Sequence, residues 1–198
     1  MGKNKRKGNQ SETSDLTPLL EPLMALQRLL EGFNNQGVII GGIAASLLGK
    51  PRFTADLDAV ILLTVEELPK LIGVAREQGI VPRFANAEAF ARKNRVLLLQ
   101  HHASGINIDI SLGLLPFETE MVARSQELKI GGIHLRLPTP EDLIILKAVA
   151  NRPQDLADIQ AVATSHPNLD KDRIQSWVEQ FGAALEIADL WEKISQLL

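Results

Sequence analysis

The chain has 198 residues, of which 45% are hydrophobic, and its formal net charge is −3 at pH 7. This length suits one domain, with or without a helical extension. The absence of cysteine excludes a disulfide framework and a thiolate metal site. The charge does not indicate a nucleic-acid-binding protein, and no apolar run is as long as a membrane span, so we expect a cytoplasmic protein without a membrane partner.

Residues 1–15 form a polar, basic leader that lacks the apolar core of a signal peptide. Such a composition cannot bury a core, so we expect this leader to be disordered. The alternative is a basic arm that touches nucleic acid. The next segment, 16–33, carries leucines at helical spacing and predicts an amphipathic helix that packs on a sheet.

Residues 38–63 predict a strand, a glycine turn, a short helix, a loop and a second strand. The β-branched run Val38–Ile40 is typical of a buried strand. Gly41 and Gly42 interrupt it and let backbone amides approach a ligand closely. The apolar segment Ile43–Leu48 predicts a helix of under two turns, whose N-terminal end offers amides and a positive dipole to a phosphate.

Asp56 and Asp58 open the second strand, predicted at 57–63. Side chains two apart on a strand point the same way, so both carboxylates leave one face. Neighbouring carboxylates repel and raise each other's pKa. A bound Mg²⁺ would remove this repulsion, and Mg²⁺ is usually held by one or two carboxylates plus substrate phosphates. The pair and the glycine turn together favour phosphoryl or nucleotidyl transfer. The alternative is a surface strand with two solvated aspartates.

A capping box at Thr64–Glu67 predicts a helix that ends near Gln78. A short helix follows at 86–94. It carries a basic cluster of Arg92, Lys93 and Arg95. This cluster is either a solvated face or the wall of a site that meets phosphates or RNA.

Two strands at 96–100 and 106–112 predict a hairpin. The second strand alternates strictly, and Asp109 lies in its middle on the polar face. If this strand lies beside Asp56 and Asp58, Asp109 completes a three-carboxylate cluster. In two-metal chemistry the third carboxylate helps to hold the second ion and can take the proton of an attacking hydroxyl. The alternative is an exposed strand face.

From Thr139 onward the sequence predicts only helices, after a helix at 116–126 and a small hairpin at 128–137. Thr139 is an N-cap, and its helix runs to Ala150. Lys147 on this helix is either a snorkelling lysine or a phosphate ligand.

Further helices are predicted at 154–165, 170–181 and 185–198. Asp155, in the first turn of the first of these, also suits the helix dipole. The change in pattern near Thr139 divides the chain into a mixed core, 16–138, and a helical C-terminal region, 139–198, that packs on the core.

Together these motifs resemble the DNA polymerase β-type nucleotidyltransferase superfamily, which combines a Gly-Gly or Gly-Ser turn, an Asp-x-Asp strand and a later strand aspartate. Within it, the chain resembles the AbiEii/AbiGii-type group of bacterial toxin and abortive-infection proteins. The motifs that carry this likeness are GGIAA, RFTADLD, IDIS, TPEDL and RPQDLAD. The resemblance spans about residues 38–160. It implies an α+β nucleotidyltransferase fold, with a short mixed sheet flanked by helices and a helical C-terminal region.

The resemblance also implies roles for the acidic and glycine positions. Asp56 and Asp58 would hold Mg²⁺, and Asp109 would be the third carboxylate of the metal site and a candidate base. Gly41 and Gly42 would bind a nucleoside triphosphate through their backbone amides.

Four further positions receive roles from the same resemblance. Arg52 and Thr54 would line the nucleotide pocket. Lys147 would contact phosphate, and Asp155 would lie near the acceptor.

The function expected from this resemblance is metal-dependent transfer of a nucleoside monophosphate from a nucleoside triphosphate to an acceptor, with release of pyrophosphate. The acceptor would be tRNA or another macromolecule, and a toxin of this kind would have a cognate antitoxin as partner. One alternative is a small-molecule nucleotidyltransferase of the antibiotic-modifying type. The other is a nucleotide-binding or partner-binding module without turnover.

Overall fold

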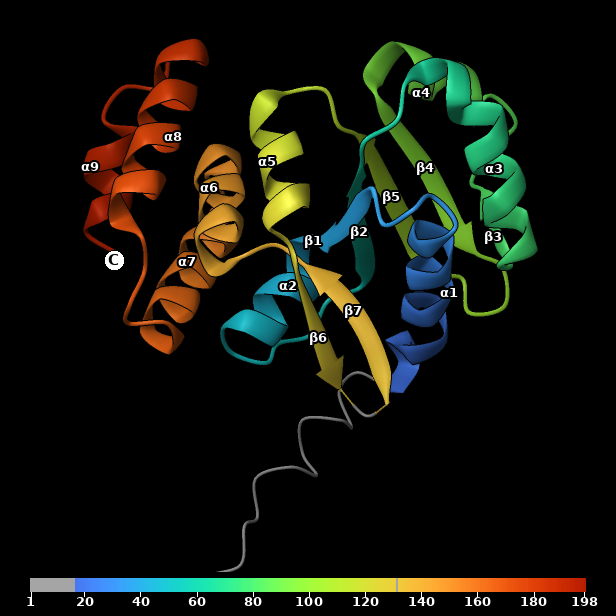
Figure 1. The fold of residues 1–198 in the computed structure, drawn as a ribbon, viewed down its shortest axis with the longest axis horizontal. Coiled ribbons are helices and arrows are strands. Elements are labelled where there is room, and N and C mark those ends of the chain that lie inside the picture. Colours follow the sequence, from blue (N-terminus) through green and yellow to red (C-terminus); the bar gives the residue numbers. More distant parts are fainter. Residues whose placement is uncertain (1–16, 131) are drawn as a thin grey trace, which may run out of the picture.

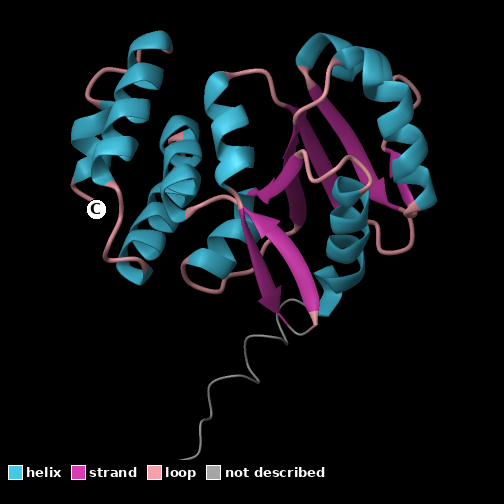
Figure 2. Cartoon of the chain, viewed as in Figure 1, coloured by secondary structure: helices cyan, strands magenta, loops and turns pink. Residues whose placement is uncertain are grey.

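The computed structural model describes residues 17–130 and 132–198 (Figure 1). The leader expected at residues 1–15 lies outside the described residues, so its disorder stays a prediction. In the described part, helices and strands are mixed up to residue 137 and only helices follow (Figure 2). None of the described helices is long and apolar enough to cross a membrane.

The described strands are β1 (Gly37–Ile40), β2 (Asp56–Ile61), β3 (Ile80–Pro82), β4 (Val96–His101), β5 (Asn107–Leu112), β6 (Gln126–Ile130) and β7 (Ile133–Leu137). The described α-helices are α1 (Leu20–Glu31), α2 (Gly41–Leu48), α3 (Leu68–Glu77), α4 (Ala87–Asn94), α5 (Pro116–Arg124), α6 (Pro140–Ala150), α7 (Pro153–Ser165), α8 (Lys171–Ala184) and α9 (Leu190–Ser195). Short 3₁₀ turns precede α1 and α3.

Strands β1 to β5 form one mixed sheet in the order β1-β2-β5-β4-β3, and β6 pairs with β7 separately. Within the larger sheet β2 and β5 run parallel, and the other neighbouring pairs are antiparallel. The predicted hairpin of β4 and β5 is confirmed. Parallel strands need a long crossover connection. Here the elements from α3 to β4 form the crossover between β2 and β5.

The two faces of this sheet differ in burial. Residues of β4 and β5 alternate between buried and half-buried, which is typical of a sheet with one covered face. The covered face is aliphatic: Leu57, Leu97 and Ile108 are each 0% exposed. Helix α1 contacts both edge strands, β1 and β3, and its leucines join this core. The opposite face carries the polar positions of β2 and β5.

The C-terminal helices lie on the side of the molecule away from α3 and α4, as the orange and red ribbons in Figure 1 show. Helices α6 and α7 contact α2. The ring of Phe117 on α5 meets Trp177 on α8 edge to face, with centroids 5.2 Å apart. Fully buried Asp142 accepts a 2.8 Å hydrogen bond from Nε of Arg173. Aromatic and ionic contacts therefore join α5, α6 and α8.

The predicted fold class, α+β with a short mixed sheet flanked by helices, is confirmed, and the structure gives this sheet five strands. Several boundaries differ from the expectation. Helix α2 begins at Gly41 rather than at Ile43, and β2 begins at Asp56. The last helix begins at Leu190 rather than at residue 185, because Glu186 and Asp189 adopt left-handed backbone angles, each with φ of 55°, that a helix cannot continue through.

Candidate active site

The three predicted carboxylates lie on the open face of the sheet, on two adjacent strands. In the parallel register, Asp58 of β2 is opposite Asp109 of β5, and Asp56 is opposite Asn107. Paired residues on neighbouring strands share a face. The structure therefore brings Asp56, Asp58 and Asp109 to one end of one face, as the condition stated for Asp109 required.

Gly41 places its backbone directly against the carboxylate of Asp58. A Cβ atom at position 41 would lie 2.0 Å from Oδ2 of Asp58, and Gly41 has a φ of +67°. Both the close approach and the left-handed backbone exclude any other residue without rearrangement. The glycine turn and the Asp-x-Asp strand therefore form one unit.

Gly42 plays the matching part beside the loop that precedes β2. A Cβ there would lie 2.5 Å from Oγ1 of Thr54 and 3.3 Å from a guanidinium nitrogen of Arg52. Thr54 is buried, and its hydroxyl lies 3.3 Å from a carboxylate oxygen of Asp56, to which it donates. Arg52 and Thr54 thus lie beside the glycine turn, where a nucleotide pocket was expected.

Electrostatic crowding at this end of the sheet is strong. The pKa of Asp58 is raised to about 6, first by burial and then by the nearby charges of Asp56 and Asp109, against the opposing charges of Lys147 and Arg152. A carboxylate in this state gains from a cation. Two adjacent carboxylates open to substrate phosphates are the oxygen donors that Mg²⁺ takes.

The third carboxylate, Asp109, has a partner within the protein. Among the described residues no group of three or more His, Cys, Asp or Glu side chains gathers closely enough to hold a metal. Asp109 instead accepts a 2.5 Å hydrogen bond from a terminal nitrogen of Arg83. Burial raises the pKa of Asp109, and the charge of Arg83 opposes that rise.

Arg83 itself is incompletely bonded. Its Nε is buried and has no hydrogen-bond partner among the described residues. An unsatisfied buried donor of this kind costs about 1–3 kcal/mol. The Arg83–Asp109 pair is therefore a contact that another acceptor could improve.

Lys147 lies in a buried ionic chain. Its Nζ is 2.8 Å from Oδ1 of Asp155 and 2.9 Å from Oδ2 of Asp158, and its side chain is 8% exposed. Arg52 donates to both oxygens of Asp158, at 2.7 and 2.8 Å. Arg152 closes the other end through a 2.7 Å bond to Asp155. Lys147 therefore does not snorkel to solvent.

This chain joins the C-terminal helices to the nucleotide loop. Burial alone would raise the pKa values of Asp155 and Asp158, but hydrogen bonds from Arg152, Arg52 and Lys147 outweigh it and lower both. Both groups are therefore charged at neutral pH. The structure places Lys147 and Asp155 beside Arg52 through Asp158, rather than in open contact with a phosphate or an acceptor.

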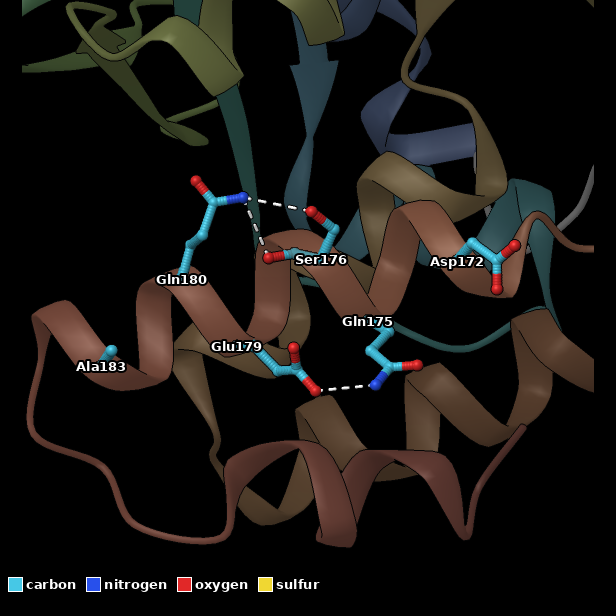
Figure 3. A pocket seen from close by; sticks show the side chains of 6 residues that line it. All are labelled: Asp172, Gln175, Ser176, Glu179, Gln180 and Ala183. Carbon is cyan, nitrogen blue, oxygen red and sulfur yellow. Dashed lines mark hydrogen bonds between the residues drawn. The ribbon is translucent and has the colours of Figure 1, made fainter.

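Two other polar features lie apart from this unit. In the basic cluster of α4, Arg92 pairs with Glu88 at 2.8 Å, and the Arg95 guanidinium donates to the carbonyls of Leu112 and Gly113. Most of that cluster is thus engaged within the protein. Figure 3 shows a pocket lined by residues of α8, in which Gln175 donates to Glu179. No basic side chain lines it, so it does not suit a phosphate.

Two residues of the site were not assigned a role from sequence. Asp158 is three residues after Asp155 on α7, so both face Lys147. The three-residue spacing of the two aspartates was the sequence signal that could have assigned Asp158 to the same cluster as Asp155. Arg83 follows β3 directly, in a stretch whose pattern does not distinguish a strand from a loop, and only the register places it beside Asp109.

A family model described as "Nucleotidyltransferase of unknown function (DUF6036)" matches residues 19–186. A comparison with curated proteins finds no match.

Several solved structures share the fold at low sequence identity. The solution structure of the antibiotic-resistance factor ANT(2'')-Ia has 17% identity and a TM-score of 0.56, over 88% of this chain and 96% of that one. ANT(2'')-Ia in complex with adenylyl-2''-tobramycin has 14% identity and a TM-score of 0.53, over 85% and 98%. An antigenic nucleotidyltransferase-like protein from Paracoccidioides brasiliensis has 16% identity and a TM-score of 0.51, over 90% and 93%.

Replacing Gly41 by alanine should disable the site beyond its effect on stability. We expect Gly41→Ala to weaken magnesium-dependent binding of a nucleoside triphosphate by more than about tenfold, because the methyl group displaces the Asp58 carboxylate. Gly105→Ala is the matched control, since Gly105 has a φ of +72° with no atom within 4 Å of the added Cβ. Isothermal titration and thermal melts of both variants separate the effects. Equal binding by the two variants would contradict the prediction.

Neutralising Asp58 should stabilise the metal-free protein at neutral pH. Because its folded pKa of about 6 lies above the ordinary value, its contribution to stability is present at low pH and is lost as pH rises through about 6. In EDTA, Asp58→Asn should melt higher than the wild type at pH 7.5, with the difference shrinking toward pH 4. Asp172→Asn, at an exposed position of α8, is the control. A lower melting temperature for Asp58→Asn than for the wild type at pH 7.5 would contradict the prediction that the charge of Asp58 destabilises the metal-free protein.

Removing the Lys147 amine should destabilise the fold strongly. We expect Lys147→Met to lower the free energy of unfolding by about 3–5 kcal/mol, because it leaves two buried carboxylates short of a cation. The lowered pKa values of Asp155 and Asp158 mean that their stabilisation is lost as pH falls, so the gap to wild type should narrow toward pH 4. Denaturant titrations measure it, with Lys129→Met, on an exposed lysine, as control. A change below 1 kcal/mol would refute the prediction.

Proposed function

The chain belongs to the nucleotidyltransferase family of unknown function DUF6036 and is an enzyme of the 2.7.7 type, and from this premise we propose that it transfers a nucleoside monophosphate from a nucleoside triphosphate at the Asp56–Asp58 end of β2. The observation that carries the proposal is the contact of the glycine turn with Asp58. This contact supports the proposal because amides of the turn, which would bind a phosphate, lie beside a pair of carboxylates that a cation would stabilise.

We assign the donor nucleotide to the β1–β2 side of the open face. Gly41 and Gly42 would offer backbone amides to the triphosphate. Asp56 and Asp58 would hold Mg²⁺, which when bound would neutralise phosphate charge and orient the α-phosphate. Thr54 keeps Asp56 in place through its hydroxyl. Arg52 stays with Asp158 and positions the loop.

Asp109 would serve as the base. The oxygen of an acceptor hydroxyl forms a new bond to the α-phosphorus. The bond between the α-phosphorus and the oxygen that bridges it to the β-phosphate breaks, and pyrophosphate leaves. The hydroxyl proton passes to the carboxylate of Asp109. Release of Asp109 from Arg83 before transfer would free both of its carboxylate oxygens for this role.

The acceptor has two candidate classes. A tRNA or another macromolecule follows from the AbiEii/AbiGii resemblance, which would also bring a cognate antitoxin and a cytoplasmic location. A small molecule of the antibiotic type follows from the shared fold with ANT(2'')-Ia. Arg92 and Arg95 of the α4 cluster already have partners within the protein. This favours an RNA-binding surface at α4 less than free arginines would.

Substituting the carboxylate pair tests the transfer itself. Asp56→Ala or Asp58→Ala should abolish magnesium-dependent triphosphate binding in isothermal titration, and labelled nucleotide should no longer pass to total tRNA or to tobramycin, whichever of these the wild type modifies. The melting temperature should not fall, because neither carboxylate has a stabilising partner cation among the described residues. Retained transfer by either variant would refute the proposed site.

A further inference from the structure

Arg83 stands at one end of a row of side chains that crosses the open face. Its backbone N–H donates to the carbonyl of Leu98 at 3.1 Å, and Leu98 pairs with Asp109, which pairs with Asp58. The glycine turn adjoins Asp58 at the other end of the row. A molecule that reaches Asp109 from the side opposite the triphosphate therefore meets Arg83.

The contact between Arg83 and Asp109 uses little of what a guanidinium can offer. One terminal nitrogen reaches one carboxylate oxygen, whereas the guanidinium fork can make two parallel bonds to a carboxylate or a phosphate. The Nε that would complete such a fork has no partner among the described residues. A phosphate group, which has three oxygens, could satisfy both donors.

The same contact weakens Asp109 as a base. One of its carboxylate oxygens accepts the bond from Arg83, and the charge of that cation opposes the rise in pKa that burial causes. The Arg83 side chain is 26% exposed and that of Asp109 is 36% exposed, so both are within reach of a ligand.

We propose that Arg83 anchors a phosphate group of the acceptor, and that this phosphate exchanges for Asp109 and thereby frees Asp109 to take the proton of the acceptor hydroxyl. The inference rests on the proposed function, because it assumes that role of Asp109. The substrate class is then a hydroxyl compound with a phosphate close to the reacting hydroxyl, as in a nucleotide or an RNA end. An acceptor of this class would be strongly preferred to a cationic sugar.

The test measures anion binding in EDTA, without turnover, so that failure of the proposed transfer leaves it valid. The probes are inorganic phosphate, adenosine 5'-monophosphate and, as its phosphate-free match, adenosine. The readouts are the dissociation constant and the ¹H–¹⁵N signal of the Arg83 Nε–H group, which is assigned by its loss in Arg83→Lys. Thermal melts confirm that each variant is folded.

We expect phosphate and the monophosphate, but not adenosine, to shift the Nε–H signal. Asp109→Asn should bind phosphate at least about fivefold more tightly than wild type, because it frees the guanidinium. Arg83→Gln should lose the binding, whereas Arg92→Gln, which removes an arginine of α4, should keep it. A purely structural ion pair would not give opposite effects in the two partners.

Three results would overturn the proposal. They are equal phosphate binding by wild type and Arg83→Gln, unchanged binding by Asp109→Asn, and, in a parallel titration without EDTA, a shift of the Nε–H signal that only magnesium and a nucleoside triphosphate produce. The third result would assign Arg83 to the donor triphosphate instead of the acceptor.

Discussion

Repulsion among carboxylates at one end of the sheet is the constraint on which the site depends. Asp56, Asp58 and Asp109 face the same way because β2 and β5 pair in register, and burial makes the charge of Asp58 costly. Among the described residues, the one direct ion pair made by these three carboxylates is that of Asp109 with Arg83. The Asp56–Asp58 side is left with an excess of negative charge, which a cation and a substrate phosphate can complete together. The negative charge of the Asp56–Asp58 side would therefore be compensated when a cation and a substrate phosphate bind together.

The ionic chain from Arg152 to Arg52 extends this logic away from the sheet. Lys147 and Asp158 connect α6 and α7 to the loop before β2. Because these charged groups are paired with one another, they hold the helices and the loop together instead of offering free charges to a substrate. The C-terminal helices therefore take part in the site indirectly, since a shift of α7 would move Arg52 and with it the loop that ends at Asp56.

Much of the fold and of the site could be predicted from sequence, for physical reasons that differ between residues. Strand periodicity put Asp56, Asp58 and Asp109 on polar faces, and the glycines marked a close backbone approach, which the contact between Gly41 and Asp58 now explains. Pairings of side chains distant in the chain could not be predicted. Lys147 gave no sign that two aspartates would enclose it, and the partner of Arg83 depends on the register of three strands. The neighbouring structures add the fold but no residue roles, at 14–17% identity.

The parallel pairing of β2 with β5 has a consequence for the order of folding. The β4–β5 hairpin joins residues close in the chain and can form early, whereas the contact of Asp58 with the strand of Asp109 must close a loop of roughly fifty residues. Asp109 therefore stays far from Asp56 and Asp58 in a partly folded chain and meets them only when the sheet is nearly complete. Their mutual repulsion then opposes the last steps of assembly, and a bound divalent ion would speed those steps and slow unfolding.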